Sequence, residues 1–235
     1  NLPVVFDSDG GTETIKINVG GDESSGFANI TFSSSLTLND ELIFSGSNLN
    51  HDLNLNGSLL GAGNLKFGSK AQANFGASYD GSSHTGDVIA AGAAENSLVT
   101  IVSNVSDDGT LLASGNQIDV QGADAKIIVN GANTFKGNIK TGDNDSTLTI
   151  NANQSAIGTI TMGAGTLNLV LAADVTSAAF VDNSSADWGT GSLVITGAGN
   201  NEVSFGTDAD GITADQLAQI TLNGSKPDIN SDILL

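Results

Sequence analysis

The carboxylates of three short acidic turns are the residues whose types and spacing best suit chemistry. The turns contain Asp208 and Asp210, Asp7 and Asp9, and Asp143 and Asp145. Carboxylate and carbonyl oxygens are the ligands that calcium prefers. We therefore expect calcium as the only cofactor, with metal-ligating residues Asp208, Asp210, Asp7 and Asp9. None of the turns has the Gly and Glu spacing of an EF-hand loop, and Asp also shapes turns without a metal, so turn formation is the alternative at each.

Two catalytic arrangements can be drawn from the sequence, and neither is convincing. Ser83 and His84 with Asp80 or Asp87 could make a nucleophilic triad, but no strand-turn-helix elbow surrounds the serine. Paired aspartates could cleave a polysaccharide, but the chain has no Arg and only one Trp and one Tyr for sugar contacts. We predict that the protein is not an enzyme and has no catalytic residues.

The charge balance limits the partners. Asp and Glu number 26 against seven Lys and Arg, and the net charge is −19. Nucleic acid binding needs clustered cations, and an anionic membrane surface would repel this chain. No Cys is present, and no apolar run is long enough to cross a bilayer. We expect neither nucleic acid binding nor membrane insertion.

Most apolar clusters have the two-residue period of a β-strand, with one polar residue between two apolar ones. Gly, Asn, Asp and Ser, which form turns, separate the clusters. The pattern predicts an all-β fold. The clusters lie at residues 15–17, 30–32, 36–38, 53–55, 65–67, 118–120, 148–150, 160–162, 193–195 and 203–205.

An internal repeat favours a parallel β-helix, that is, a β-solenoid. Residues 84–101 resemble residues 131–150: Gly86 matches Gly137, and residues 99–101 match residues 148–150. Similarity at about fifty residues suits two circuits of a solenoid per repeat. A β-sandwich is the alternative, although it would have longer strands and more aromatic residues than the 5% found here. Circuits of about 20 residues predict a rod about 40 Å long, with aliphatic side chains inside and Asn, Thr and Ser ladders at the corners.

The pattern changes after Phe180. Trp188, the only Trp, follows, and the sequence from Thr213 to Gln216 predicts a capped helix with Thr213 as N-cap. A short helix after stacked strands suits a terminal cap. We therefore expect a β-solenoid over residues 1–180 and a C-terminal capping module over residues 181–235.

Several segments resemble the repeats of autotransporter-associated β-strand proteins, which are passenger-type β-helices of bacterial surfaces. They are SLLGAGNLKF, GANTFKGNIKTGDNDSTLTI and GAGTLNLVL. The tail from SADWGTGSLVITG to TADQLAQITLNG resembles the module that closes related proteins with a Pro-Glu-Pro sorting tail. The resemblance covers about residues 50–225 and implies a structural β-helix rather than an activity. No translocator barrel or sorting tail follows Leu235. We therefore expect either that such a segment was removed or that the chain is released or assembled outside the cell.

Both termini are apolar and are candidates for assembly. We expect an extracellular or cell-surface structural protein, a subunit of a filament, sheath or biofilm matrix, whose main partner is another copy of itself. A monomeric adhesin that binds a glycan or another surface protein along one face is the alternative. An ice-binding role is not expected, because the Thr spacing is irregular. The assembly residues predicted are Leu2, Val4, Val5, Phe6, Ile233, Leu234 and Leu235.

Overall fold

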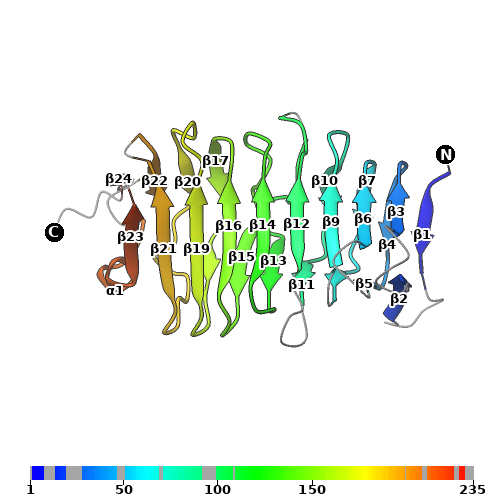
Figure 1. Ribbon diagram of the computed structural model, residues 1–235, viewed down its shortest axis with the longest axis horizontal. Coiled ribbons are helices and arrows are strands. Elements are labelled where there is room, and N and C mark those ends of the chain that lie inside the picture. Colours follow the sequence, from blue (N-terminus) through cyan, green and yellow to red (C-terminus); the bar gives the residue numbers. More distant parts are fainter. Residues whose placement is uncertain are drawn as a thin grey trace.

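The chain winds into a parallel β-solenoid (Figure 1). The computed structural model describes residues 2–7, 14–19, 28–46, 51–68, 71–91, 99–107, 109–198, 200–207, 211–224 and 228–230. Every strand pairing in these residues is parallel, as in Val4 to Leu36, Leu53 to Ala73 and Leu148 to Leu169. The predicted fold class is confirmed, and a β-sandwich, which is built from antiparallel sheets, is excluded.

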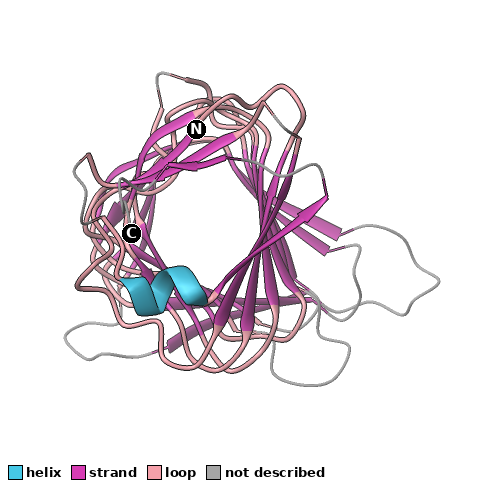
Figure 2. Cartoon of the chain, turned by 90° about the vertical axis from the view of Figure 1, so that its left-hand side faces the viewer, coloured by secondary structure: helices cyan, strands magenta, loops and turns pink. Residues whose placement is uncertain are grey.

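Three walls surround the core (Figure 2). The first wall is divided into two four-stranded sheets, sheet A and sheet D, and a single bridge between Leu112 and Phe135 lies between them along the chain. In spatial order, sheet A contains β1 (Val4–Phe6), β4 (Leu36–Leu38), β7 (Ser58–Gly61) and β10 (Asp80–His84). Sheet D contains β17 (Gln154–Ile157), β20 (Ala178–Phe180), β22 (Glu202–Phe205) and β24 (Asp228–Asn230).

The second wall is the seven-stranded sheet B. In spatial order, it contains β18 (Ile160–Thr161), β15 (Asn138–Thr141), β13 (Gln117–Val120), β11 (Val88–Ala90), β8 (Leu65–Phe67), β5 (Glu41–Gly46) and β2 (Thr14–Val19).

The third wall is the nine-stranded sheet C, which takes one strand from each circuit and shows its strands side by side in Figure 1. In spatial order, it contains β23 (Ile220–Gly224), β21 (Ser192–Gly197), β19 (Thr166–Leu171), β16 (Ser146–Ile150), β14 (Ala125–Val129), β12 (Thr100–Ser103), β9 (Ala71–Phe75), β6 (His51–Leu55) and β3 (Ala28–Phe32).

The core consists of stacked inward rows from each wall. In sheet C one row runs through Leu53, Ala73, Ile101 and Leu148, each with 0% of its surface exposed. Alternation along each strand sends the intervening residues outward. The space enclosed by the ribbons in Figure 2 is therefore filled with apolar side chains, most of them aliphatic, as the clusters in the sequence predicted.

Asparagine ladders join successive circuits at the ends of the sheet C strands, as predicted. The amide nitrogen of Asn151 donates to the side-chain oxygen of Asn130 at 2.7 Å, and Asn130 donates to Asn104 at 2.8 Å. A second pair, Asn74 to Asn54, lies on the outer face of the same sheet at 3.1 Å. Each amide has both a donor and an acceptor, so equivalent amides can continue the ladder from one circuit to the next.

The register shows how the internal repeat is built. Gly86 and Gly137 occupy equivalent positions two circuits apart, because Val88 pairs with Ile118 and Ile118 with Ile139. Residues 99–101, however, are equivalent to residues 146–148 rather than 148–150. A slip of two residues keeps the same side chains inward, which is why sequence similarity alone did not reveal it.

The strands after residue 180 extend the same walls. β21 and β23 follow β19 in sheet C, and β22 and β24 follow β20 in sheet D. The single described helix, α1 (Ala214–Ala218), lies between β22 and β23 in the chain, where earlier circuits have a strand of sheet B (Figure 2). Its capping box is the predicted one: Thr213 is the N-cap, and its hydroxyl accepts from the amide of Gln216.

Candidate assembly ends and other candidate sites

Among the residues that the structure describes, no strand pairs with the outer edge of three sheets at the N-terminal end of the solenoid. β1, β2 and β3 are the last strands of sheets A, B and C. In a parallel ladder a residue directs its N–H and C=O to one side, and the next residue directs them to the other. The carbonyl of Phe32 accepts from the amide of Asn56 at 2.8 Å, so Phe32 and Ile30 bond to β6. The backbone groups of Asn29 and Thr31 therefore point to the outer edge of β3.

Apolar side chains close this end only in part. Val4, Phe6, Ile30 and Phe32 face the core but stay partly exposed. The rings of Phe6 and Phe32 meet edge to face at 6.3 Å. Inward residues of the next circuit, such as Leu36, are fully buried. The first circuit thus presents apolar surface that another layer of strands would cover.

The predicted N-terminal assembly residues lie on this end. β1 pairs with β4 of its own chain, which makes Val4 and Phe6 partly buried. Leu2 and Val5 have 86% and 57% of their surface exposed. Ile233, Leu234 and Leu235 lie outside the described residues.

The C-terminal end has a matching edge in sheet C. The amide of Leu193 donates to the carbonyl of Gln219 at 3.1 Å, whereas the amide of Gln219 donates to Gln216. The carbonyl of Gln219 and the backbone groups of Thr221 therefore point toward β21. By the same alternation, the groups of Ile220 and Leu222 point to the outer edge of β23. The side chains of Ile220 and Leu222 pack on the core and are only partly buried.

One buried side chain, that of Gln216, fastens α1 to the preceding circuit. Its Nε2 donates to the carbonyls of Asn183 and Ala186 at 2.8 and 2.9 Å, and its Oε1 accepts from the amide of Thr213 at 2.7 Å. Only 5% of Gln216 is exposed. This residue holds in place the turn that leads into β23.

The two ends are complementary in register. Ile30 and Leu222 begin and end the same inward row of sheet C. Phe32 begins the adjacent row, which ends in Gly224, where there is no side chain to oppose a ring. A second copy placed beyond β23 would continue both rows.

The calcium candidates are only partly within the described residues. Asp9, Asp208 and Asp210 lie outside them. The carboxylate of Asp7, which follows β1, accepts from the side-chain amide of Asn39 at 2.9 Å. No group of three or more His, Asp or Glu side chains suited to a metal occurs in the described part of the chain. Calcium binding stays a prediction.

The third acidic turn stabilises a corner. Oδ1 of Asp143 accepts from the amide of Ala164 at 3.0 Å, and Oδ1 of Asp145 accepts from the amide of Thr166 at 2.9 Å. Both contacts reach the next circuit, so these carboxylates satisfy backbone donors at a turn, as the alternative interpretation predicted for them.

The structure does not bring Ser83, His84 and Asp80 together as a catalytic triad. His84 is buried, and its Nε2 lies 2.9 Å from the carbonyl of Gly63. Ser83 is the next residue on β10 and is exposed on the opposite side. The carboxylate of Asp80 accepts from Ser82 rather than from His84. Burial lowers the pKa of His84 below its usual value, although the Gly63 carbonyl and the charge of Asp87 oppose this effect.

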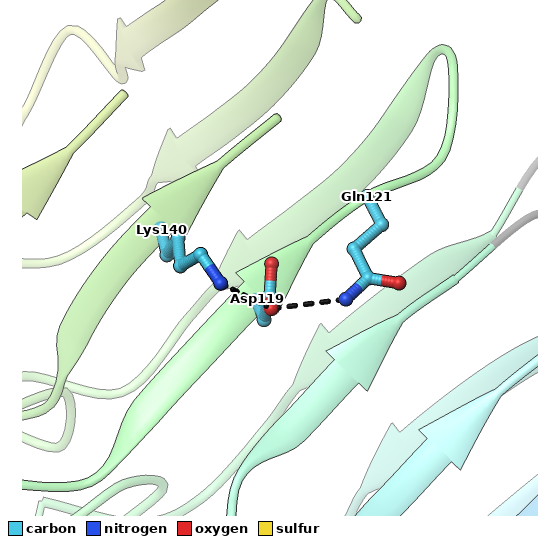
Figure 3. A network of polar contacts seen from close by, with 3 residues as sticks. All are labelled: Asp119, Gln121 and Lys140. Atoms are coloured by element: carbon cyan, nitrogen blue, oxygen red, sulfur yellow. Dashed lines mark hydrogen bonds and ion pairs between the residues drawn. The ribbon is translucent and has the colours of Figure 1, made fainter. Parts of the chain in front are cut away.

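An ion pair links two circuits on the outer face of sheet B (Figure 3). Nζ of Lys140 lies 3.1 Å from Oδ2 of Asp119, which also accepts from Nε2 of Gln121 at 3.0 Å. Lys140 is half exposed, so the pair contributes about 1 kcal/mol or less. We interpret it as a structural contact between β13 and β15.

A groove of about 650 Å³ lies on the outside of sheet D. Small side chains form it, including Ala156, Ala179 and Ser204, and Val181 and Asp182 line one part. Val181 has 40% of its surface exposed. Trp188 does not contribute to this groove, because it is 2% exposed and packs against Phe205.

Comparisons of the chain with protein-family models, with curated proteins and with solved structures found no match. The resemblance to autotransporter-associated repeats therefore stays a prediction. Among the residues that the structure describes, no helix has the length and apolar character of a membrane span.

Sequence reasoning missed the edge positions Asn29, Thr31, Ile220 and Leu222 and the pair Asp119–Lys140. A signal for the pair existed, because 21 residues separate its members, which is one circuit. The edge positions could not be found from composition, since their importance comes from backbone direction and from their place in the first and last strands of a sheet.

Proposed function

We propose that this chain is an extracellular structural protein whose copies join end to end into a filament, sheath or biofilm matrix. The observation that supports it is the match between the outer edges of β3 and β23. These five-residue strands run in the same direction at opposite ends of one sheet. Strand edges of this kind add further strands readily.

The proposed junction has a defined register. Leu222 of one copy would donate to the carbonyl of Asn29 of the next and accept from the amide of Thr31. Sheet C would then continue across the junction with its inward rows intact. Because an N-terminal end meets a C-terminal end, the contact is heterologous and does not close, which gives an open, polar filament. Nine strands at about 4.8 Å predict a repeat of about 43 Å for each subunit.

A proline at position 31 tests the junction. The N–H of Thr31 points away from β6, so Thr31→Pro removes no backbone hydrogen bond of the described chain, and proline is tolerated on such an edge. It does remove the hydroxyl of Thr31, which accepts a hydrogen bond from Nδ2 of Asn54 at 3.5 Å. Thr31→Val is the matched control, since it loses the same hydroxyl but keeps the N–H. By electron microscopy we expect filaments with a 43 Å repeat for the natural chain and for Thr31→Val, and none for Thr31→Pro. Circular dichroism checks that all three fold alike.

The proposal fails if Thr31→Pro forms the same filaments, or if the natural chain forms none. The proposal includes calcium, with Asp7, Asp9, Asp208 and Asp210 as its ligands, so each sample is imaged with calcium and with a chelator. Filaments that persist in chelator would show that the junction does not need calcium, and the proposed strand register would still stand.

Glycan binding by a monomeric adhesin is the second candidate, and the groove on sheet D favours it. The groove offers hydroxyls and the carboxylate of Asp182 beside exposed Val181. Dispersed short rods that bind a glycan array, with binding lost in Ser204→Trp, would support this function instead.

A further inference from the structure

The outer face of sheet C changes character along the solenoid. On β6 and β9 it presents polar residues, among them Asp52, Asn54 and Asn74. From β12 to β21 the outward positions include the aliphatic residues Val102, Ile128, Val170 and Val194. The other outward positions are threonines apart from Lys126, Asn168 and Ser192. We call this second part, from β12 to β21, the lateral face.

The fold does not require aliphatic residues here. Figure 2 shows a wall one sheet thick, so these side chains point away from the core. Val102, Ile128, Val170 and Val194 are all partly exposed. The amides on β6 and β9 show that the same sheet accepts polar residues at equivalent positions.

Carboxylates are missing from the lateral face although the chain has 26 acidic residues and a net charge of −19. The nearest ones, Asp124 and Asp145, precede β14 and β16 at the corner. Two copies of so acidic a chain repel each other over most of their surface. The lateral face is where they can approach without bringing carboxylates together.

We propose that the lateral face packs against the lateral face of a second copy in a neighbouring filament. Two such faces share the spacing of about 4.8 Å between strands, so their β-branched rows can interdigitate in the manner of packed sheets. This inference rests on the proposed end-to-end assembly.

The area of the face explains why the neighbour should belong to a filament. β12 to β21 span about 24 Å by about 16 Å, which is roughly 400 Å² from each copy. A pair would bury roughly 800 Å², less than the ~1,000 Å² of a stable specific interface. Repetition along a filament multiplies the weak contact through multivalency. Lateral pairing should therefore follow elongation and be nearly absent between single chains.

The substitution Val170→Glu tests the face, with Val170→Thr as the matched β-branched control. By electron microscopy we expect paired or bundled filaments for the natural chain and for Val170→Thr. For Val170→Glu we expect single filaments with an unchanged axial repeat. Bundles that survive Val170→Glu, or filaments that stay single in the natural chain, overturn the lateral inference and leave end-to-end assembly intact. If no filaments form at all, both proposals fall.

A cross-link gives a second readout, because the natural chain has no Cys. Single cysteines at Val102, Ile128, Thr149 and Val170 sample the lateral face, and Thr161→Cys on the outside of sheet B is the control. Under mild oxidation of assembled protein, at least one lateral position should give disulfide-linked dimers in greater yield than Thr161→Cys. Adding Thr31→Pro should abolish that excess. Equal yields at all positions contradict the inference.

Discussion

Replacing the single residue Gln216 should markedly lower the stability of the last circuit. Gln216→Ala removes three hydrogen bonds, those to the carbonyls of Asn183 and Ala186 and that from the amide of Thr213. The carbonyl of Asn183 keeps one donor, the amide of Ala186 at 2.9 Å. An unsatisfied buried group costs about 1–3 kcal/mol, and a more accessible hydrogen bond about 0.5–1.5 kcal/mol. Because the buried carbonyl of Asn183 keeps a donor, the lower value applies to all three contacts, and we expect a loss of about 1.5–4.5 kcal/mol in the stability of α1 and β23.

Gln219→Ala is the matched control for this loss. Nε2 of Gln219 also donates to two carbonyls, those of Gly189 and Gly191, both at 3.1 Å. Gln219 is only partly buried, so water can replace these bonds, and its loss should cost about 1 kcal/mol. Equal effects of the two substitutions would refute burial as the cause.

Hydrogen exchange is the suitable assay, because a solenoid can open at one end without unfolding elsewhere. The amides of β23 should exchange faster in Gln216→Ala, while those of β14 and β16 keep the rates of the natural chain. Uniform acceleration along the chain would contradict this local account.

Gln216→Glu adds a pH test of the same site. The introduced carboxyl keeps an acceptor for Thr213 but, when ionised, faces the carbonyls of Asn183 and Ala186. Burial and these carbonyls should raise its folded pKa above the unfolded value of about 4.3. The folded state then binds the proton more tightly, so the variant should regain stability relative to the natural chain as the pH falls through the raised pKa. A constant difference across pH would be inconsistent with this.

Two further predictions concern the buried residues His84 and Leu148. Burial lowers the pKa of His84 in the folded chain. The unfolded chain therefore takes up the proton first, and the free energy of unfolding should fall as the pH drops below about 6.5. In urea titrations at several pH values, the free energy of unfolding should fall less with pH for His84→Gln than for the natural chain, and parallel curves would disprove this. Leu148 has 0% of its surface exposed, and Leu148→Ala should lower the free energy of unfolding by about 2–5 kcal/mol. The outward control Thr147→Val should change it by about 0.5 kcal/mol or less. Similar urea midpoints for the two variants would contradict the inward packing of Leu148.

Local pattern was sufficient to predict the strands and the helix cap. Leu53 and Leu55 flank Asn54 in the two-residue period of a strand, and Thr213 and Gln216 have the spacing of a capping box. These features depend on residues a few positions apart, where geometry follows directly from sequence.

Contacts between circuits were harder to predict, because circuit length varies. Leu53 pairs with Ala73, twenty residues on, whereas Gln72 pairs with Thr100. A sequence without a fixed repeat length does not reveal which residues stack. The anchoring role of Gln216 on Asn183 was therefore invisible, although its capping role was not.

Assembly through the ends stays a prediction, and the sequence located only some of the candidate positions. Apolar termini indicated assembly through the ends, and the structure places Val5 and Leu2 on the exposed N-terminal edge. The stronger candidates are Thr31 and Leu222, which are unremarkable in sequence. Their significance depends on which way a backbone amide points, a property that strand register determines and side-chain chemistry does not.

The assembly proposal follows from how a parallel solenoid satisfies its backbone. Each strand takes its hydrogen bonds from the circuit before and the circuit after, so the first and last strands have no such neighbour within the stack. Here α1 takes the position of only one wall at the C-terminal end, and its anchor, Gln216, steadies the turn before β23 rather than covering the edge of β23. If that cap served only to end the stack, Gln216→Ala would lower stability and leave association unchanged. If it positions β23 for the next copy, the same substitution should shorten filaments under conditions where the rest of the solenoid stays folded.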